Sequence, residues 1–140
     1  IDVLSAAALA CGLGKDQAGD PTRMPAALGF ELATIRGAEA IGLADEIGSL
    51  EVGKAADIVV HRTSDPGWVP RGDIAHQLLW STDGRSVRDV LVAGRVVVRD
   101  GVCVSLDEQA LRSAAADARA DLLRRAGVVV PSSWPLVPSA

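Results

Sequence analysis

Residues 89–101, DVLVAGRVVVRDG, constrain the fold of this chain more than any other stretch. Two valine-rich runs flank Ala93-Gly94, a pattern typical of a β-hairpin. Because alanine resists a positive φ, we expect a bulged turn in which Gly94 is the left-handed residue. Asp100-Gly101 marks a second turn, and Ile58–His61 reads as another short strand. The second half of the chain therefore predicts an antiparallel sheet.

The first half predicts helices instead. Residues 2–11 are rich in alanine and favour a helix that stops at Gly12 and Gly14. Residues 15–23 read as a polar loop, and a second helix begins near Pro25, since proline suits a first helical turn.

Two further helices carry capping signals. Thr34 is expected to cap a short helix over residues 35–41, with Gly42 closing it. Ser105-x-x-Glu108 is a capping box that opens a last helix ending at Gly127. The apolar stripe of this last helix consists of Leu111, Ala115, Ala118 and Leu122.

Composition limits the class of protein. The 140 residues are 49% apolar and 23% charged, as in an ordinary globular domain, and the net charge of −4 argues against a nucleic-acid or membrane partner. Cys11 and Cys103 lie far apart and form no metal-binding or redox spacing, which favours two buried thiols in the cytoplasm. The chain begins at Ile1 without a methionine, so we expect processing or a longer parent polypeptide.

Residues 48–54, GSLEVGK, are close to a phosphate-binding loop but lack its context. Ala55 replaces the hydroxyl residue that would bind Mg²⁺, and Glu51 would place a carboxylate where an anion should bind. Residues 56–60 read as a strand, whereas a phosphate loop is followed by a helix. We therefore expect no nucleotide site.

No catalytic motif can be found by spacing. His61 and His76 stand alone, without an H-x-H, H-E-x-x-H or C-x-x-C partner pattern. Ser49, Ser81 and Ser86 lie outside any G-x-S-x-G elbow. We assign no catalytic residue and no metal ligand, and we interpret both histidines as structural.

Three segments together resemble the amidohydrolase superfamily. They are ATIRGAEAIGL at residues 33–43, IGSLEVGKAADIVV at 47–60 and RDVLVAGRVVVRDG at 88–101, and the likeness covers about residues 1–126. The nearest branch is similar to cytosine-deaminase-like and chlorohydrolase-like enzymes. Within these segments we interpret the following residues as structural: Thr34, Gly37, Gly48, Gly53, Lys54, Asp57, Gly94 and Gly101. The resemblance also implies that Lys54 is exposed or paired locally, and Asp57 is expected to bind backbone N–H groups.

The resemblance implies an α+β fold: the terminal helices of an incomplete (β/α)8 barrel and the C-terminal part of a small β-sandwich, closed by a C-terminal helix. On this basis residues 1–46 are a helical remnant of the barrel, and residues 47–104 supply strands of the composite sandwich. Residues 105–127 form the amphipathic helix, and residues 128–140 form a proline-rich tail.

The resemblance also implies the chemistry of a full-length parent. Such an enzyme uses a divalent metal, zinc by preference, to activate the water that attacks a C–N or C–halogen carbon of a nitrogen heterocycle. The family's ligands lie upstream of Ile1, and Asp2 corresponds to an acid that follows the metal-binding aspartate by several residues. We therefore expect no metal bound by this chain, and this chain alone to be inactive.

Two hypotheses remain open for the chain itself. It scaffolds a metal-dependent amidohydrolase, or it is a non-catalytic truncated module that pairs with a partner chain. Both need the remainder of the polypeptide or a companion chain, because the missing barrel and sandwich strands would leave apolar helix faces and sheet edges uncovered. A homo-oligomer is compatible with either hypothesis.

Overall fold

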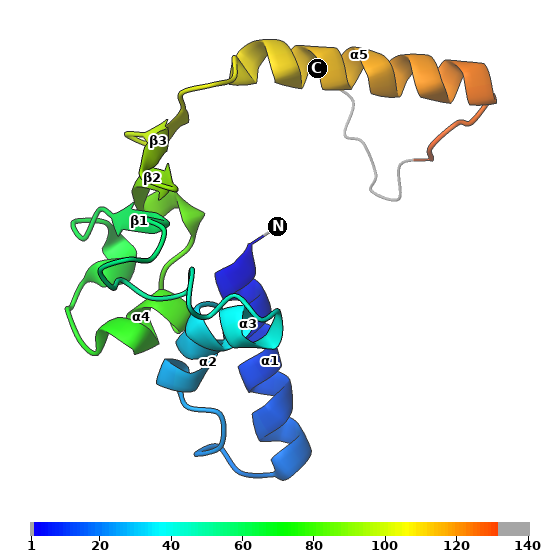
Figure 1. The fold of residues 1–140 in the computed structure, drawn as a ribbon. Coiled ribbons are helices and arrows are strands. Elements are labelled where there is room, and N and C mark those ends of the chain that lie inside the picture. Colours follow the sequence, from blue (N-terminus) through cyan, green and yellow to red (C-terminus); the bar gives the residue numbers. More distant parts are fainter. Residues whose placement is uncertain (1, 132–140) are drawn as a thin grey trace. The chain divides into compact units, whose positions relative to one another are not determined.

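A computed structural model describes residues 2–131 of the chain (Figure 1). The chain divides into two compact units, residues 1–104 and residues 105–140. Trp134 and most of the proline-rich tail lie outside the described residues. The division into four segments at residues 46, 104 and 127 stays a prediction.

The first unit contains a small cluster of helices (Figure 1): α1 (Val3–Ala18), α2 (Ala26–Leu32), α3 (Ile35–Ala40) and α4 (Ile74–Trp80). Gly29 of α2 packs closely against two of the other helices. A Cβ atom there would lie 2.7 Å from the Cys11 sulfur of α1 and 2.7 Å from a methyl carbon of Leu79 in α4. Gly29 is therefore the point where three helices meet, and Cys11 beside it is fully buried.

The predicted end of α1 at Gly12 and Gly14 is wrong. The helix continues through both glycines to Ala18 and ends at Gly19, whose φ of 61° is left-handed. A glycine inside a helix costs only about 1 kcal/mol, so packing against α2 and α4 can offset two of them. At Gly14 a Cβ atom would lie 2.8 Å from Met24 Cγ, so this glycine also allows a close contact.

Thr34 occupies the position before α3 as expected but does not cap it. Its hydroxyl donates to the Phe30 carbonyl oxygen at 2.8 Å, and its side chain makes no capping bond. The hydroxyl binds back onto α2 because α2 ends only two residues earlier, which brings carbonyl acceptors within reach. Gly42 ends the segment with a φ of 75° and donates to the Glu39 carbonyl oxygen.

A four-stranded antiparallel sheet follows, in the order β1-β2-β3-β4. Its strands are β1 (Ile58–His61), β2 (Val87–Val92), β3 (Arg95–Arg99) and β4 (Val102–Cys103). Two short 3-10 turns, η1 (Pro66–Trp68) and η2 (Gly84–Ser86), lie between β1 and β2 on either side of α4. The mixed α and β character is confirmed, while the incomplete barrel and the sandwich stay predictions.

The β2–β3 turn differs from the bulged turn that we expected. Val92 pairs directly with Arg95, so the turn has two residues, and Ala93 and Gly94 both have positive φ, 48° and 76°. This is the backbone of a type I′ turn, whose twist matches that of the flanking strands. The unfavourable conformation of Ala93 is held by hydrogen bonds from outside the hairpin.

The second unit contains α5 (Glu108–Ala126), which ends at Gly127 as expected, with a φ of 62°. The predicted capping box is wrong in its first residue. Asp107, and not Ser105, is the N-cap, and its carboxylate accepts the Ala110 N–H at 3.0 Å. A carboxylate caps well and also interacts favourably with the positive end of the helix dipole, so Asp107 is a strong competitor.

Candidate functional site

The lysine of the GSLEVGK segment is engaged within its own loop. Lys54 Nζ donates to Ser49 Oγ at 2.6 Å and lies 3.2 Å from Glu51 Oε1, and its side chain is only 13% exposed. The Ser49 hydroxyl in turn donates to Glu51 Oε1 at 2.5 Å. Hydrogen bonds from Ser49 and then from Lys54 hold the pKa of Glu51 below its usual value. Local pairing of Lys54 is confirmed, and the loop does not present it to a phosphate.

The glycines of this segment and of α3 serve close backbone packing. Gly48 has a φ of 93°, and a Cβ atom on it would lie 2.8 Å from the Ala38 Cβ and 3.2 Å from the Thr34 carbonyl oxygen. A Cβ atom on Gly37 would lie 2.9 Å from the carbonyl oxygen of Leu32. Gly48 therefore docks the loop onto α3, and Gly37 lets α3 begin directly after α2.

Residues 56 and 57 fasten the loop to the distant hairpin. Asp57 Oδ1 accepts the Ala93 N–H at 2.7 Å, and the Ala56 carbonyl oxygen accepts the Gly94 N–H at 3.0 Å. These two bonds satisfy both turn amides and hold Ala93 at its positive φ. The expectation that Asp57 binds backbone N–H groups is confirmed, although its partner is 36 residues away in sequence.

The next turn, at Asp100 and Gly101, is held in the same way. Gly101 has a φ of 79° and donates its N–H to the Arg88 carbonyl oxygen at 2.8 Å. Asp89 Oδ1 accepts the Asp100 N–H at 3.1 Å. In each of these two turns a carboxylate accepts a hydrogen bond from a backbone N–H group, and so stabilises the turn.

His61 is a hydrogen-bonded histidine at the end of β1. Its Nδ1 lies 2.8 Å from the Ser86 hydroxyl oxygen, and that hydroxyl lies 3.1 Å from the Asp83 carbonyl oxygen, which can only accept. The Ser86 hydroxyl therefore donates to Asp83, and His61 Nδ1–H donates to Ser86. The His61 ring also packs on the Trp68 ring, with centroids 5.7 Å apart, and burial lowers the pKa of His61.

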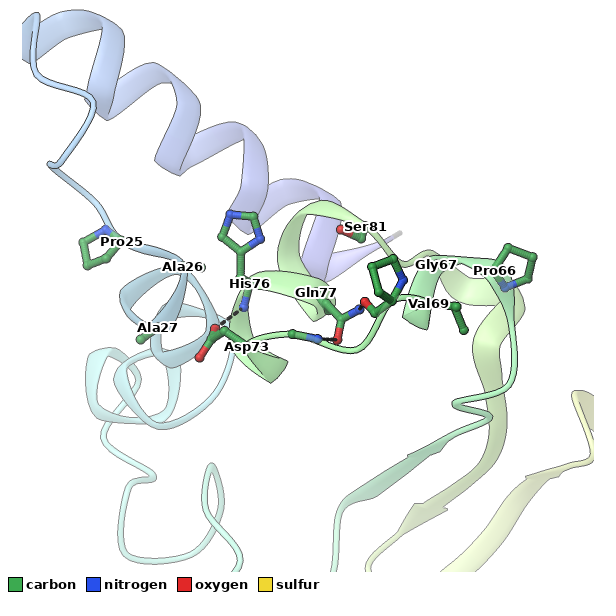
Figure 2. Close-up of a pocket in the computed structure, with 12 residues that line it drawn as sticks. Pro25, Ala26, Ala27, Pro66, Gly67, Val69, Asp73, His76, Gln77 and Ser81 are labelled. Atoms are coloured by element: carbon green, nitrogen blue, oxygen red, sulfur yellow. Dashed lines mark hydrogen bonds between the residues drawn. The ribbon is translucent and has the colours of Figure 1, made fainter.

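His76 borders a pocket of about 520 Å³ between the start of α2, η1 and α4 (Figure 2). The Asp73 carboxylate accepts the backbone N–H of His76 at 2.7 Å, while the His76 ring points away from that carboxylate. The pocket-lining residues, all of them described, show no hydrogen-bonded pair of a nucleophile and a base.

Sequence reasoning missed two residues that shape this pocket. Asp73 is the N-cap of α4, and its position just before an apolar run was a usable signal. Gln77 is buried, accepts the Gly72 N–H at 3.1 Å and donates to the Pro70 carbonyl oxygen at 3.0 Å. No sequence pattern marks Gln77, because its role depends on where the loop at residues 70–72 returns.

The residues that the structure describes do not fit a zinc ion. Between residues 2 and 131, no three His, Cys, Asp or Glu side chains are grouped so that they could hold a metal. Asp2 is the N-cap of α1: Oδ1 accepts the Ser5 N–H at 3.1 Å and Oδ2 accepts the Ser5 hydroxyl at 2.7 Å. The hydrogen bond from the Ser5 backbone, and then that from its hydroxyl, lower the pKa of Asp2.

Each helix of the described part is too short or too polar to span a lipid bilayer.

Comparison with known sequences gives a consistent set of relatives. A profile of the amidohydrolase family matches residues 1–97. The S-triazine hydrolase of Gordonia rubripertincta is 42% identical over 109 residues, which cover 75% of this chain and 23% of that protein. The 5-methylthioadenosine/S-adenosylhomocysteine deaminase of Desulforudis audaxviator is 43% identical over 108 residues, 76% of this chain and 25% of that protein. The chain spans about a quarter of the length of these relatives.

Solved structures agree. An adenosine deaminase from Xanthomonas campestris with bound zinc superimposes with a TM-score of 0.82 at 34% identity, over 87% of this chain and 28% of that one. The atrazine chlorohydrolase TrzN from Arthrobacter aurescens, complexed with zinc, gives a TM-score of 0.69 at 28% identity, over 84% and 25%. The fold of the described residues therefore recurs within two larger zinc-bound enzymes.

Proposed function

The chain belongs to the amidohydrolase family, and from this premise we propose that it is the closing segment of a metal-dependent hydrolase. The proposed reaction replaces an amino or halogen substituent of a nitrogen heterocycle with a hydroxyl group from water. The observation that supports it most is the match to a deaminase and a triazine hydrolase at above 40% identity, each over about a quarter of the relative's length.

Within that enzyme, the proposed role of these residues is scaffolding. Gly48 docks its loop on α3, Lys54 closes the loop on itself, and Asp57 fastens the loop to the β2–β3 turn. Each of these side chains or backbone atoms is used for structure, so none remains for chemistry. The segment thereby holds helices and sheet strands at fixed positions relative to one loop.

A divalent metal, zinc by preference, supplies such enzymes with a water of lowered pKa. Because the described residues do not fit a metal, no reaction step is assigned to them. We propose that the metal ligands belong to the three quarters of the relatives' length that this chain does not span. The heterocyclic substrate would contact the same part of the polypeptide.

The uncovered apolar surface of the first unit supports a larger assembly. On α1, Val3, Leu9 and Leu13 are 55%, 64% and 61% exposed. The apolar residues that are buried within the described part are few and mostly small: Ala7, Cys11, Ala38, Trp68 and Leu79. A helix face of this kind needs cover, and we propose that the remainder of the same polypeptide, or a companion chain, supplies it.

The test compares the 140-residue chain with the longest open reading frame that contains it. Both proteins are loaded with zinc and assayed for ammonia released from 5-methylthioadenosine and S-adenosylhomocysteine, and for chloride released from atrazine. We expect turnover by the longer protein only. If neither protein turns over any of these compounds while both remain folded, the non-catalytic pairing module is favoured. Turnover by the 140-residue chain that is lost on substitution of His61 or His76 would overturn the scaffolding role.

A further inference from the structure

Helix α5 carries an apolar stripe that the described residues leave in contact with water. None of its side chains is buried, and Leu111 and Leu122 are 56% and 64% exposed. Most of the stability of a helix in a protein comes from packing of its apolar face, and among the described residues α5 buries none of its 19 side chains. The stripe is therefore a candidate for contact with another surface.

The stripe reads the same in both directions along the helix. Leu111, Ala115, Ala118 and Leu122 are spaced by four, three and four residues. In an antiparallel pair related by a twofold axis, Leu111 of one copy lies beside Leu122 of the other, and the two alanines meet at the centre. Small residues at the centre allow the two backbones to approach, while leucines close both ends.

The charges at the two ends of α5 favour an antiparallel orientation of the two helices. Asp107 and Glu108 stand at its start, and Arg124 and Arg125 stand at its end. Asp107 and Arg125 are 18 residues apart, which is five helical turns, so they lie on the same side of the stripe. Antiparallel packing then faces Asp107 of each copy with Arg125 of the other, whereas parallel packing would bring the acidic starts together. Opposed helix dipoles favour the same arrangement.

We infer that α5 is a self-association surface, which binds α5 of a second copy of this chain in an antiparallel, twofold-symmetric pair. Arg125 forms an exposed ion pair with Asp121 of its own helix at 3.6 Å, and because its side chain is 76% exposed it can exchange this partner for Asp107 of the second copy. The helix is about 28 Å long at the usual rise per residue. A pair of single helices of this length buries less surface than most stable interfaces do. The dimer is therefore concentration-dependent.

Directed cross-linking tests both contact and orientation. Leu111→Cys and Leu122→Cys are made separately in the full chain, mildly oxidised alone and as a mixture, and the linked peptides are identified by mass spectrometry. We expect a link between positions 111 and 122 in the mixture and no 111–111 or 122–122 link in either variant alone. Ser113→Cys, on the opposite side of the helix, is the matched control and gives no link above background when mixed with Leu122→Cys.

Sedimentation equilibrium of charge variants gives an independent readout. Arg125→Glu should raise the dimer dissociation constant between about twofold and about thirtyfold, because two exposed ion pairs are lost in each dimer. Arg124→Glu makes the same charge change one residue away on the far side of the helix and should leave the constant unchanged. A monomer at every concentration tested, a 111–111 link in the single variant, or equal effects of the two arginine variants would each overturn the inference.

Discussion

The bond between Asp57 and the β2–β3 turn can be tested locally. Ala93 adopts a φ of 48°, which costs an L-residue about 1–2 kcal/mol, and the Asp57 carboxylate accepts its N–H at 2.7 Å. Asp57→Ala removes this acceptor. Because a hydrogen bond to an exposed carboxylate contributes about 1–2 kcal/mol, the turn should open about 5- to 30-fold more often. Asp57→Asn keeps an acceptor oxygen without the charge, so it should increase the opening of the turn less than Asp57→Ala does.

The same reasoning predicts a change in the opposite direction at Ala93. Ala93→Gly removes the steric cost of the positive φ, while the extra chain entropy of glycine offsets about 0.5–1 kcal/mol of the gain. We therefore expect the hairpin to be more stable by at most about 1.5 kcal/mol. With the turn already relaxed, Asp57→Ala should still be destabilising, since the carboxylate bonds the amide and not the alanine side chain.

Amide hydrogen exchange measured by NMR is the assay, because it reports the opening of individual residues and does not require global unfolding. The amides of Ala93 and Gly94, which bond Asp57 and Ala56, are the reporters. Asp45→Ala is the control, since it removes the same charge from an exposed turn. Equal exchange at Ala93 in Asp57→Ala and Asp45→Ala would refute the role of the carboxylate.

Two further predictions concern packing and pH. Gly48→Ala should destabilise the chain by about 2–5 kcal/mol, because its Cβ would meet the Ala38 Cβ at 2.8 Å and its φ is 93°. Gly53→Ala, with a φ of 101° and open space around the Cβ, should cost only about 1–2 kcal/mol, and equal losses in thermal unfolding would contradict the packing role of Gly48. Burial lowers the pKa of His61 below its ordinary value of 6.5, so the unfolded chain takes up this proton first. The contribution of neutral His61 to the free energy of unfolding is therefore fully present above about pH 6.5. It is lost as the pH falls through the lower pKa of the folded state. His61→Gln should flatten the decline in melting temperature below about pH 6.5, so an unchanged slope in this variant would count against the prediction.

Local patterns predicted the strands well. The valine-rich runs around Ala93-Gly94 and the short run at Ile58–His61 all form strands. Short runs of β-branched residues between turn residues pack well on the half-buried surface of a sheet, so the local pattern is enough to predict them. The last helix also ends at Gly127 as expected. Lys54 is paired within its loop, which is one of the two placements that the resemblance implied.

The errors arose where distant residues decide the local structure. Gly12 and Gly14 stay inside α1 because α2 and α4 pack against it, and no local signal shows that packing. Ala93 accepts a positive φ because Asp57, 36 residues earlier, bonds its amide. The sequence predicted a structural role for both histidines, and the hydrogen bond of the His61 ring agrees with it. The sequence could not show the Ser86 partner of His61, because that contact depends on how β1 and β2 pair.

Metal content is the most direct test of the claim that these residues support a metal centre without coordinating it. The 140-residue chain and the longest open reading frame that contains it are purified, incubated with zinc, dialysed and measured by plasma mass spectrometry. We expect about one zinc ion per longer polypeptide, and none retained by the 140-residue chain, since its described residues form no ligand group. One zinc ion held by the shorter chain and released when His61, His76 or Asp2 is substituted would contradict the claim.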